Sequence, residues 1–319
     1  MRLPTGSRLL RDVAQPLSGG YAAGGSLYYA ESIPVRQHTG EVYEMSRVDP
    51  VSGRALAGRR FPSSLDDTLL ADGSLWVTTS AGDRTSLWRL DPRTLAVRSR
   101  LNLPSARPSE GIAGSLAVAG GHLWAGAGSL DRVSLRTGRV NRVVSPPYPG
   151  PVQVAADRSG RILMASLGYE HPTYIARLNP VTGETVAHTT ISHSLGQPTF
   201  GGIIDGGAWI ENNDGSRTTA WRVDVNTLRL TRLGLGRTDR VAVRVNDGIL
   251  WVTEPFGRRS NLSYCADPYT GRPLVRLPPL PGDSVLLAAD SSELYFTDVP
   301  VNAHAVRLEA APVSRRCTA

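Results

Sequence analysis

The chain has 319 residues, of which 40% are hydrophobic and 20% are charged. This composition supports a buried core and excludes wholesale disorder. The formal net charge is +7, and all 35 basic residues are arginines because the sequence contains no lysine. Lysine chemistry, such as Schiff-base formation or a Walker-type phosphate site, is therefore excluded. The arginines are dispersed among 28 acids, which argues against nucleic-acid binding, and no apolar segment is long enough to predict a membrane span.

A short phrase recurs along the chain: a turn with glycine, a small residue, and then a leucine, an aromatic residue and another small residue. Its clearest copy is Gly73-Ser74-Leu75-Trp76-Val77. Copies begin at residues 25, 73, 121, 160, 207, 248 and 292, with spacings of 48, 48, 39, 47, 41 and 44 residues. Each copy predicts a buried β-strand that follows a glycine turn.

A second phrase follows each of the first six copies and predicts a turn between two further strands. Asp or Asn followed by Pro, and then by Gly, is turn chemistry. The turns begin at Asp49, Asp91, Ser134, Asn179, Asp224 and Asp267.

Each repeat therefore holds four strands, which we call a, b, c and d in chain order. A four-stranded repeat of this length is typical of a propeller blade, and neither helix periodicity nor crossover helices are present. The sequence predicts an all-β fold, a seven-bladed β-propeller with four-stranded antiparallel blades. We expect residues 1–319 to form a single domain with almost no helix.

The last repeat has strands near residues 284–289, 293–297 and 304–309, so it lacks an outer strand. Residues 7–14 form a spare strand before the first repeat. Because an open propeller would expose strand edges, we expect the segment 1–14 to close the last blade as its outer strand. Residues 310–319 are expected to form a tail.

The phrases at 73–78 and 87–92 resemble those of bacterial β-propellers of the YVTN, NHL and virginiamycin B lyase type. The resemblance covers the whole chain as a repeat and implies a scaffold shared by lyases, sensors and ligand binders. In the lyase, histidines precede the inner strands, but the matching residues 108–111, 151–153, 197–199 and 238–240 contain none. The catalytic His and Glu pattern of the lyase is therefore not matched here.

In a propeller, the d–a and b–c connections emerge on one face, opposite the glycine and Asp-Pro turns. Acids gather near this face, including Asp66 and Asp67 beside an inner strand. Converging carboxylates serve acid–base chemistry or bind a divalent cation. The candidate ligand-binding residues are Glu31, Asp67, Glu110, Glu211, Arg240 and Glu254.

Secondary candidates lie in loops of the same face. Glu170 and His171 stand beside His193 as an acid–base or metal pair, and Phe200 is placed to stack on a ligand. The alternative is that these residues are structural, since no metalloprotease, nucleophile-elbow or phosphate-loop motif is present.

Three functions are compatible with this sequence. The first is a non-catalytic propeller that binds a small molecule or peptide at the d–a and b–c face, as a monomer and without a cofactor. The second is a lyase, cyclase or hydrolase that uses the carboxylates of this face or His171, with a divalent cation as an option. The third is a protein-interaction platform.

Two cysteines allow one disulfide. Cys265 lies on strand c of the sixth repeat, and Cys317 lies in the tail after the neighbouring seventh repeat. The alternatives are a bridge between them, or a buried thiol at 265 and a free thiol at 317. A bridge would favour an extracytoplasmic, mature protein over a cytoplasmic one, because cytosolic disulfides are rare.

Overall fold

The computed structural model is all-β. It describes residues 8–13, 17–34, 41–81, 84–103, 114–148, 150–167, 171–191, 197–213, 218–233, 242–246, 248–255, 260–277, 280–281, 285–289, 292–298 and 306–317. Within these ranges there are 29 strands and one short 3₁₀ helix, η1 (Arg315–Cys317), so the expected scarcity of helix is confirmed. None of the described helical structure is long and apolar enough to cross a membrane.

The strands form seven antiparallel sheets, and the fold is a seven-bladed β-propeller, as the seven repeats predicted. The chain divides into two compact units. The central unit contains residues 64–92 and 96–239, and the terminal unit contains residues 1–63, 93–95 and 240–319. The expectation of one domain over the whole chain stays a prediction.

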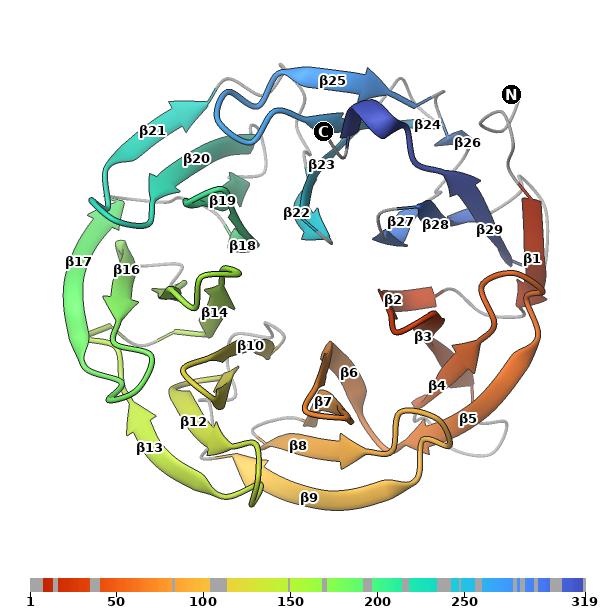
Figure 1. The fold of residues 1–319 in the computed structure, drawn as a ribbon, viewed down its shortest axis with the longest axis horizontal. Helices are drawn as coiled ribbons and strands as arrows, with labels where there is room; N and C mark the ends of the chain where they lie inside the picture. The colour runs from red at the N-terminus through yellow and green to blue at the C-terminus, as the bar shows by residue number, and fades with distance from the viewer. Residues whose placement is uncertain are drawn as a thin grey trace. The chain divides into compact units, whose positions relative to one another are not determined.

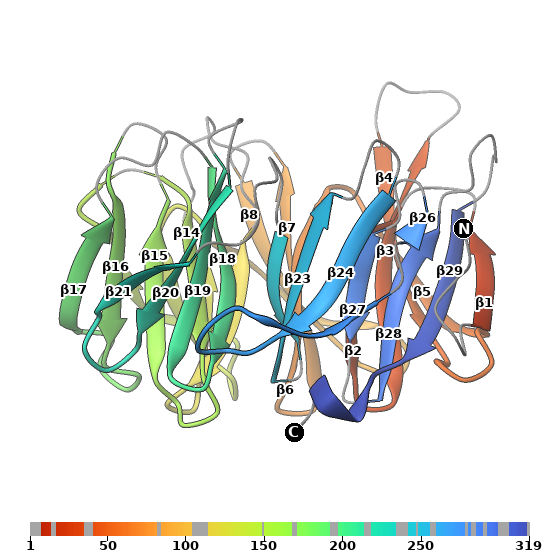
Figure 2. The ribbon, with the colours of Figure 1, turned by 90° about the horizontal axis from the view of Figure 1, so that it is seen from above.

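The central unit contains the second to fifth blades, whose strands follow the chain from the inner to the outer edge (Figure 1). The antiparallel course of neighbouring strands is visible in Figure 2 for β16 and β17. The strands are β6 (Ser64–Ala71), β7 (Ser74–Ala81), β8 (Arg84–Leu90), β9 (Val97–Leu103), β10 (Ser115–Ala119), β11 (His122–Gly126), β12 (Leu130–Ser134), β13 (Val140–Val144), β14 (Val152–Ala156), β15 (Ile162–Ser166), β16 (Thr173–Leu178), β17 (Thr185–Ile191), β18 (Gln197–Ile204), β19 (Gly207–Asn213), β20 (Thr218–Asp224) and β21 (Leu230–Leu233).

The terminal unit contains the first, sixth and seventh blades. The sixth blade has an additional strand, β26, which pairs with β24. The strands are β2 (Leu17–Ala23), β3 (Ser26–Pro34), β4 (Glu41–Val48), β5 (Ala55–Phe61), β22 (Ala242–Asn246), β23 (Ile249–Pro255), β24 (Ser260–Ala266), β25 (Pro273–Arg276), β26 (Leu280–Pro281), β27 (Val285–Ala289), β28 (Glu293–Asp298), β29 (Val306–Pro312) and β1 (Arg8–Val13).

The repeated Leu-aromatic phrase forms the b strands, which are buried on both faces. On β11, Leu123 and Ala125 share an apolar cluster with Trp76 of the second blade. The intervening Trp124 lies in a different cluster, with Val152 of the fourth blade. Successive side chains of a strand point to opposite faces, so three consecutive apolar residues supply the contacts with both neighbouring blades.

The Asp-Pro phrase forms the c–d turns, where the first residue of the turn binds backbone groups. Asp224 accepts hydrogen bonds from the backbone N–H of Thr227 at 2.8 Å and of Asn226 at 3.0 Å. These bonds, that of Thr227 first, lower the pKa of the Asp224 carboxyl. The phrase is therefore a feature of the scaffold.

The N-terminal strand β1 completes the seventh blade by antiparallel pairing with β29, as the unpaired last repeat predicted (Figure 1). Leu10 of β1 packs with Leu27 of the first blade and Leu308 of the seventh. The prediction of a tail over residues 310–319 is wrong in its first part. Ala310 and Ala311 are buried and belong to β29, because they pair with β28.

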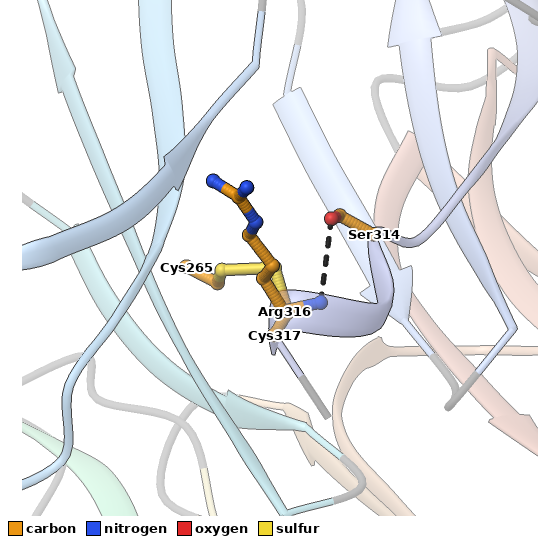
Figure 3. Close-up of a disulfide and its surroundings, with 4 residues drawn as sticks. All are labelled: Cys265, Ser314, Arg316 and Cys317. Atoms are coloured by element: carbon orange, nitrogen blue, oxygen red, sulfur yellow. Dashed lines mark hydrogen bonds between the residues drawn. A yellow bond between two sulfur atoms is a disulfide. The ribbon is translucent and has the colours of Figure 1, made fainter. Parts of the chain in front are cut away.

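A disulfide joins Cys265 of β24 to Cys317 of η1, with a Cα–Cα distance of 5.8 Å (Figure 3). Both cysteines belong to an apolar cluster with Trp251 of the sixth blade and Leu294 of the seventh. Of the two alternatives for the cysteines, the structure has the bridge, which attaches the end of the seventh blade to the sixth.

The c–d turn of the first blade supports the closing strand through Gly53. Its φ is +69°, and a Cβ at this position would collide with the backbone of Leu10. Gly138 has φ +67°, but its Cβ would meet only the Ser99 hydroxyl, at 3.6 Å. We expect Gly138→Ala to cost about 1 kcal/mol of stability, the cost of a left-handed L-residue. Gly53→Ala should cost about 2 kcal/mol more, because overpacking adds to this strain.

Urea denaturation of both glycine variants measures this difference. Equal destabilisation by the two substitutions would contradict the contact between the turn and β1.

The disulfide closes a loop between residues that are 52 positions apart. By the loop-entropy relation, Cys317→Ser should lower the free energy of unfolding by about 4 kcal/mol. Thiol titration of the denatured parent protein without reductant should detect no free thiol. Two reactive thiols per chain would show that the bridge does not form.

Candidate functional site

In the central unit, polar side chains near the start of the inner strands bind the backbone of the next inner strand. Asp67 of β6 accepts a hydrogen bond from the Leu116 N–H at 2.7 Å. The Ser115 hydroxyl accepts one from the Val154 N–H at 2.7 Å, and the Gln153 side chain accepts one from the Phe200 N–H at 2.7 Å. These bonds fix the d–a ends of β10, β14 and β18, where the candidate site was expected.

Asp67 is therefore a positioning residue of this face. One of its carboxylate oxygens accepts the N–H of Leu116, and the other accepts the N–H of Thr68 at 2.7 Å. Both oxygens thus have backbone donors, which gives Asp67 a structural role.

Asp66 occupies a β-bulge on β6. Leu65 pairs with Thr79 and Asp67 pairs with Thr78, so Asp66 is the extra residue between them. A bulge re-aims a side chain, and the inner strands β2, β18 and β27 carry bulges as well. The Asp66 carboxylate accepts a short hydrogen bond from the Ser80 hydroxyl and another from the Gly114 N–H.

Burial raises the pKa of Asp66 to about 6, although its hydrogen bonds with Ser80 and Gly114 lower it. The carboxyl group therefore changes its charge close to neutral pH, which is the range that acid–base chemistry and pH-dependent binding require. The sequence placed Asp66 among the acids of this face but favoured Asp67, because a one-residue bulge leaves no mark in the strand periodicity.

The inner strands of the central unit carry acids and no arginine. The a and b strands of the four central blades contain Asp66, Asp67 and Glu211, and none of these eight strands contains an arginine. Glu211 is only 8% exposed on β19. Arg84, at the start of β8 beside the b–c connection of the second blade, is exposed, so this face carries charges of both signs.

Two of the predicted acids belong to the terminal unit. Glu31 of β3 lies opposite Glu44 of β4 and near Arg11 of the closing strand. Burial raises the pKa of Glu31, Arg11 lowers it and Glu44 raises it further. Glu31 thus belongs to the charge balance between the first blade and β1. The backbone of Glu254 pairs with Leu262 on β24, while its side chain lies outside the description.

The structure describes only some of the remaining candidate residues. Glu110, Glu170, His193 and Arg240 lie outside the described residues. The His171 ring stacks on Tyr148 at 5.8 Å, and Tyr148 meets Tyr174 edge-on at 6.5 Å. Phe200 packs against the apolar cluster shared by the fourth and fifth blades. Within the described part of the chain, no three His, Cys, Asp or Glu side chains form a potential metal site.

Asp131 on β12 is a buried acid that the sequence analysis did not identify. It is 0% exposed, and neither carboxylate oxygen has a hydrogen-bond partner among the described residues. Its cross-strand neighbour Ala125 belongs to the apolar cluster between the second and third blades. Burial raises the pKa of Asp131 to about 7. The sequence could have identified Asp131 as unusual, because no other repeat has an acid at this position. The equivalent residues are Ser46, Trp88, Ala176, Trp221 and Tyr264.

Comparison with known proteins supports the fold. BamB from Moraxella catarrhalis is 15% identical with a TM-score of 0.55, and the match covers 96% of each chain. The Dos1 propeller is 12% identical with a TM-score of 0.58, and the match covers 93% of this chain and 78% of that chain. At this identity the likeness shows the fold alone. No family model and no curated protein sequence matches, so the YVTN, NHL and lyase-like resemblance remains an interpretation of the repeat.

Asp131 makes stability depend on pH. Its folded pKa of about 7 lies above the ordinary value of 3.8, so the cost of ionising it is absent at low pH and increasingly destabilises the fold as pH rises between these values. The free energy of unfolding of Asp131→Asn minus that of the parent should increase by about 3 kcal/mol from about pH 5 to about pH 8. The readout is urea denaturation at both pH values.

Asp157→Asn is the control of opposite sign: burial raises the pKa of Asp157, but hydrogen bonds from Ser159 and Arg161 outweigh it and lower this pKa overall. This variant should be less stable than the parent at neutral pH and should approach it in acid. A constant difference between Asp131→Asn and the parent at every pH would mean that Asp131 is not a buried titrating group.

Proposed function

We propose that this propeller binds a small molecule or peptide at the d–a and b–c face, and that the ligand presents a cationic group to Asp66. The observation that carries the proposal is the bulge on β6, which places Asp66 beside Ser80 and the Gly114 N–H while both oxygens of Asp67 accept backbone N–H groups. Carboxylates bind ammonium and guanidinium groups through charge-assisted hydrogen bonds.

The composition of the inner strands supports a cationic ligand. The eight a and b strands of the central unit have no arginine, whereas the chain as a whole has 35. Because the pKa of Asp66 is about 6, binding should weaken as the solution becomes acidic.

Isothermal titration calorimetry with triarginine and spermidine tests the proposal, with tricitrulline as an uncharged probe. We expect triarginine to bind about tenfold more weakly at about pH 5 than at about pH 7.5, because Asp66 is then protonated. Asp66→Asn should bind weakly at both pH values and lose the pH dependence.

Asp91→Asn is the matched control, since Asp91 is an acid of the opposite, c–d turn face, where it pairs with Arg98 at 2.6 Å. This variant should bind like the parent. Equal binding of tricitrulline, or no binding of either cationic probe, would overturn the proposal.

A catalytic role is the second candidate, because a carboxyl group of pKa about 6 next to the Ser80 hydroxyl is suited to proton transfer. Mass spectrometry of a bound ligand after prolonged incubation separates the two functions. An unchanged ligand supports binding alone, whereas a product that Asp66→Asn does not form supports an enzyme.

We further propose that the chain works in an oxidising, extracytoplasmic compartment. The Cys265–Cys317 bridge supports this, because structural disulfides are rare in the cytosol. Recovery of the protein with two free thiols from the cytoplasm of its native cells would contradict it.

A further inference from the structure

The third blade differs from its neighbours in charge. Residues 114–148 contain four arginines, at 132, 136, 139 and 142, and a single acid, Asp131. Because Asp131 is fully buried, the blade presents no carboxylate of its own to solvent. Arg136 and Arg139 are exposed on the c–d turn, and none of the described ion pairs involves them.

Two of these arginines belong to the repeat, since Arg132 matches Arg47, Arg89, Arg177 and Arg222, and Arg139 matches Arg54, Arg229 and Arg272; the third blade differs in Arg136 and in its lack of an exposed acid. The first, fourth, fifth and sixth blades begin the c–d turn with Asp or Asn, whose side chain accepts two backbone N–H groups, as Asp224 does at 2.8 and 3.0 Å. Ser134 takes that place in the third blade, and its hydroxyl accepts the Thr137 N–H at 3.2 Å. The third blade therefore lacks a turn acid, and it carries Arg136 where the first and fourth blades have valine and the second blade has Arg93.

The arginines lie beside an exposed strand edge. β13 is the last strand of its sheet and pairs on one side with β12; no described strand pairs with its other side. Val143 of β13 is 46% exposed, and Arg132 reaches this strand by donating a hydrogen bond to the Asn141 side chain at 2.8 Å. The turn at Gly138 adjoins Ser99 of β9, a strand that also carries Arg98 and Arg100.

We propose that the third-blade edge, defined as β13 with Arg136 and Arg139, binds an extended acidic segment of a partner protein. The segment would add a strand to the blade, with its backbone bonded to β13, an apolar side chain on Val143 and carboxylates on the arginines. The exposed valine and the unpaired backbone favour a peptide over a nucleic acid or a lipid surface, which would use the charges alone. This surface is separate from Asp66, so it does not rest on the proposed function.

The test is fluorescence anisotropy with a labelled peptide of four Glu-Val repeats. We expect Arg136→Glu/Arg139→Glu to bind this peptide about tenfold more weakly than the parent, since two attractions become repulsions. The matched control is Arg229→Glu/Arg232→Glu, which makes the same change of charge at exposed sites of the fifth blade. It should change the affinity by about twofold or less, because exposed charges far from the peptide are screened.

Probes of the same charge but different chemistry complete the experiment. A fully N-methylated Glu-Val peptide cannot donate backbone hydrogen bonds and should bind much more weakly than the parent peptide. Equal loss in the two charge-reversal variants, equal binding of the N-methylated peptide, or tighter binding of oligothymidine or phosphatidylglycerol vesicles would each overturn the proposal. Circular dichroism and melting temperature verify that both variants are folded.

Discussion

The burial of each b strand between two neighbouring sheets is the constraint on which the central unit depends. A single sheet of four short strands cannot bury both of its faces, so it is stable only when a sheet packs on each side. Trp76 and Trp124 illustrate the consequence, because each lies at the boundary between its own blade and the next. The apolar residues of the repeat phrase are therefore explained by packing between blades more than by strand formation itself.

The two ends of the chain use different means to stabilise the terminal unit. β1 supplies a strand and satisfies the open edge of β29, whereas the C-terminal segment supplies a covalent bond through Cys317. Strand pairing is reversible and depends on the fit at Gly53, while the disulfide acts mainly on the unfolded chain. Both devices join segments that are far apart in sequence, so neither can be argued from local propensity.

In the central unit, the local environment of an aspartate determines its role. Asp66 and Asp67 are adjacent and both accept hydrogen bonds. Backbone N–H groups engage both oxygens of Asp67, whereas Asp66 stands in a bulge and accepts from the Ser80 hydroxyl and the Gly114 N–H. Asp131 is a third case, an acid held among apolar side chains with its pKa raised to about 7. Environment alone divides these three chemically identical groups into a support, a candidate ligand site and a source of pH-dependent stability.

The sequence by itself determined the all-β class, the seven blades, the turns and the pairing of the N-terminal strand with the last blade. It could do so because turn chemistry and the period of two are local properties, and because the last repeat visibly lacks a strand. It identified the acids and Cys265 with Cys317 but left their roles open. Only the tertiary structure decided that Asp66 stands in a bulge, that Glu31 lies near Arg11 and that Asp131 is buried. Each of these three features depends on the register between strands and on contacts with the neighbouring blade. The sequence of a single repeat determines neither the register nor those contacts.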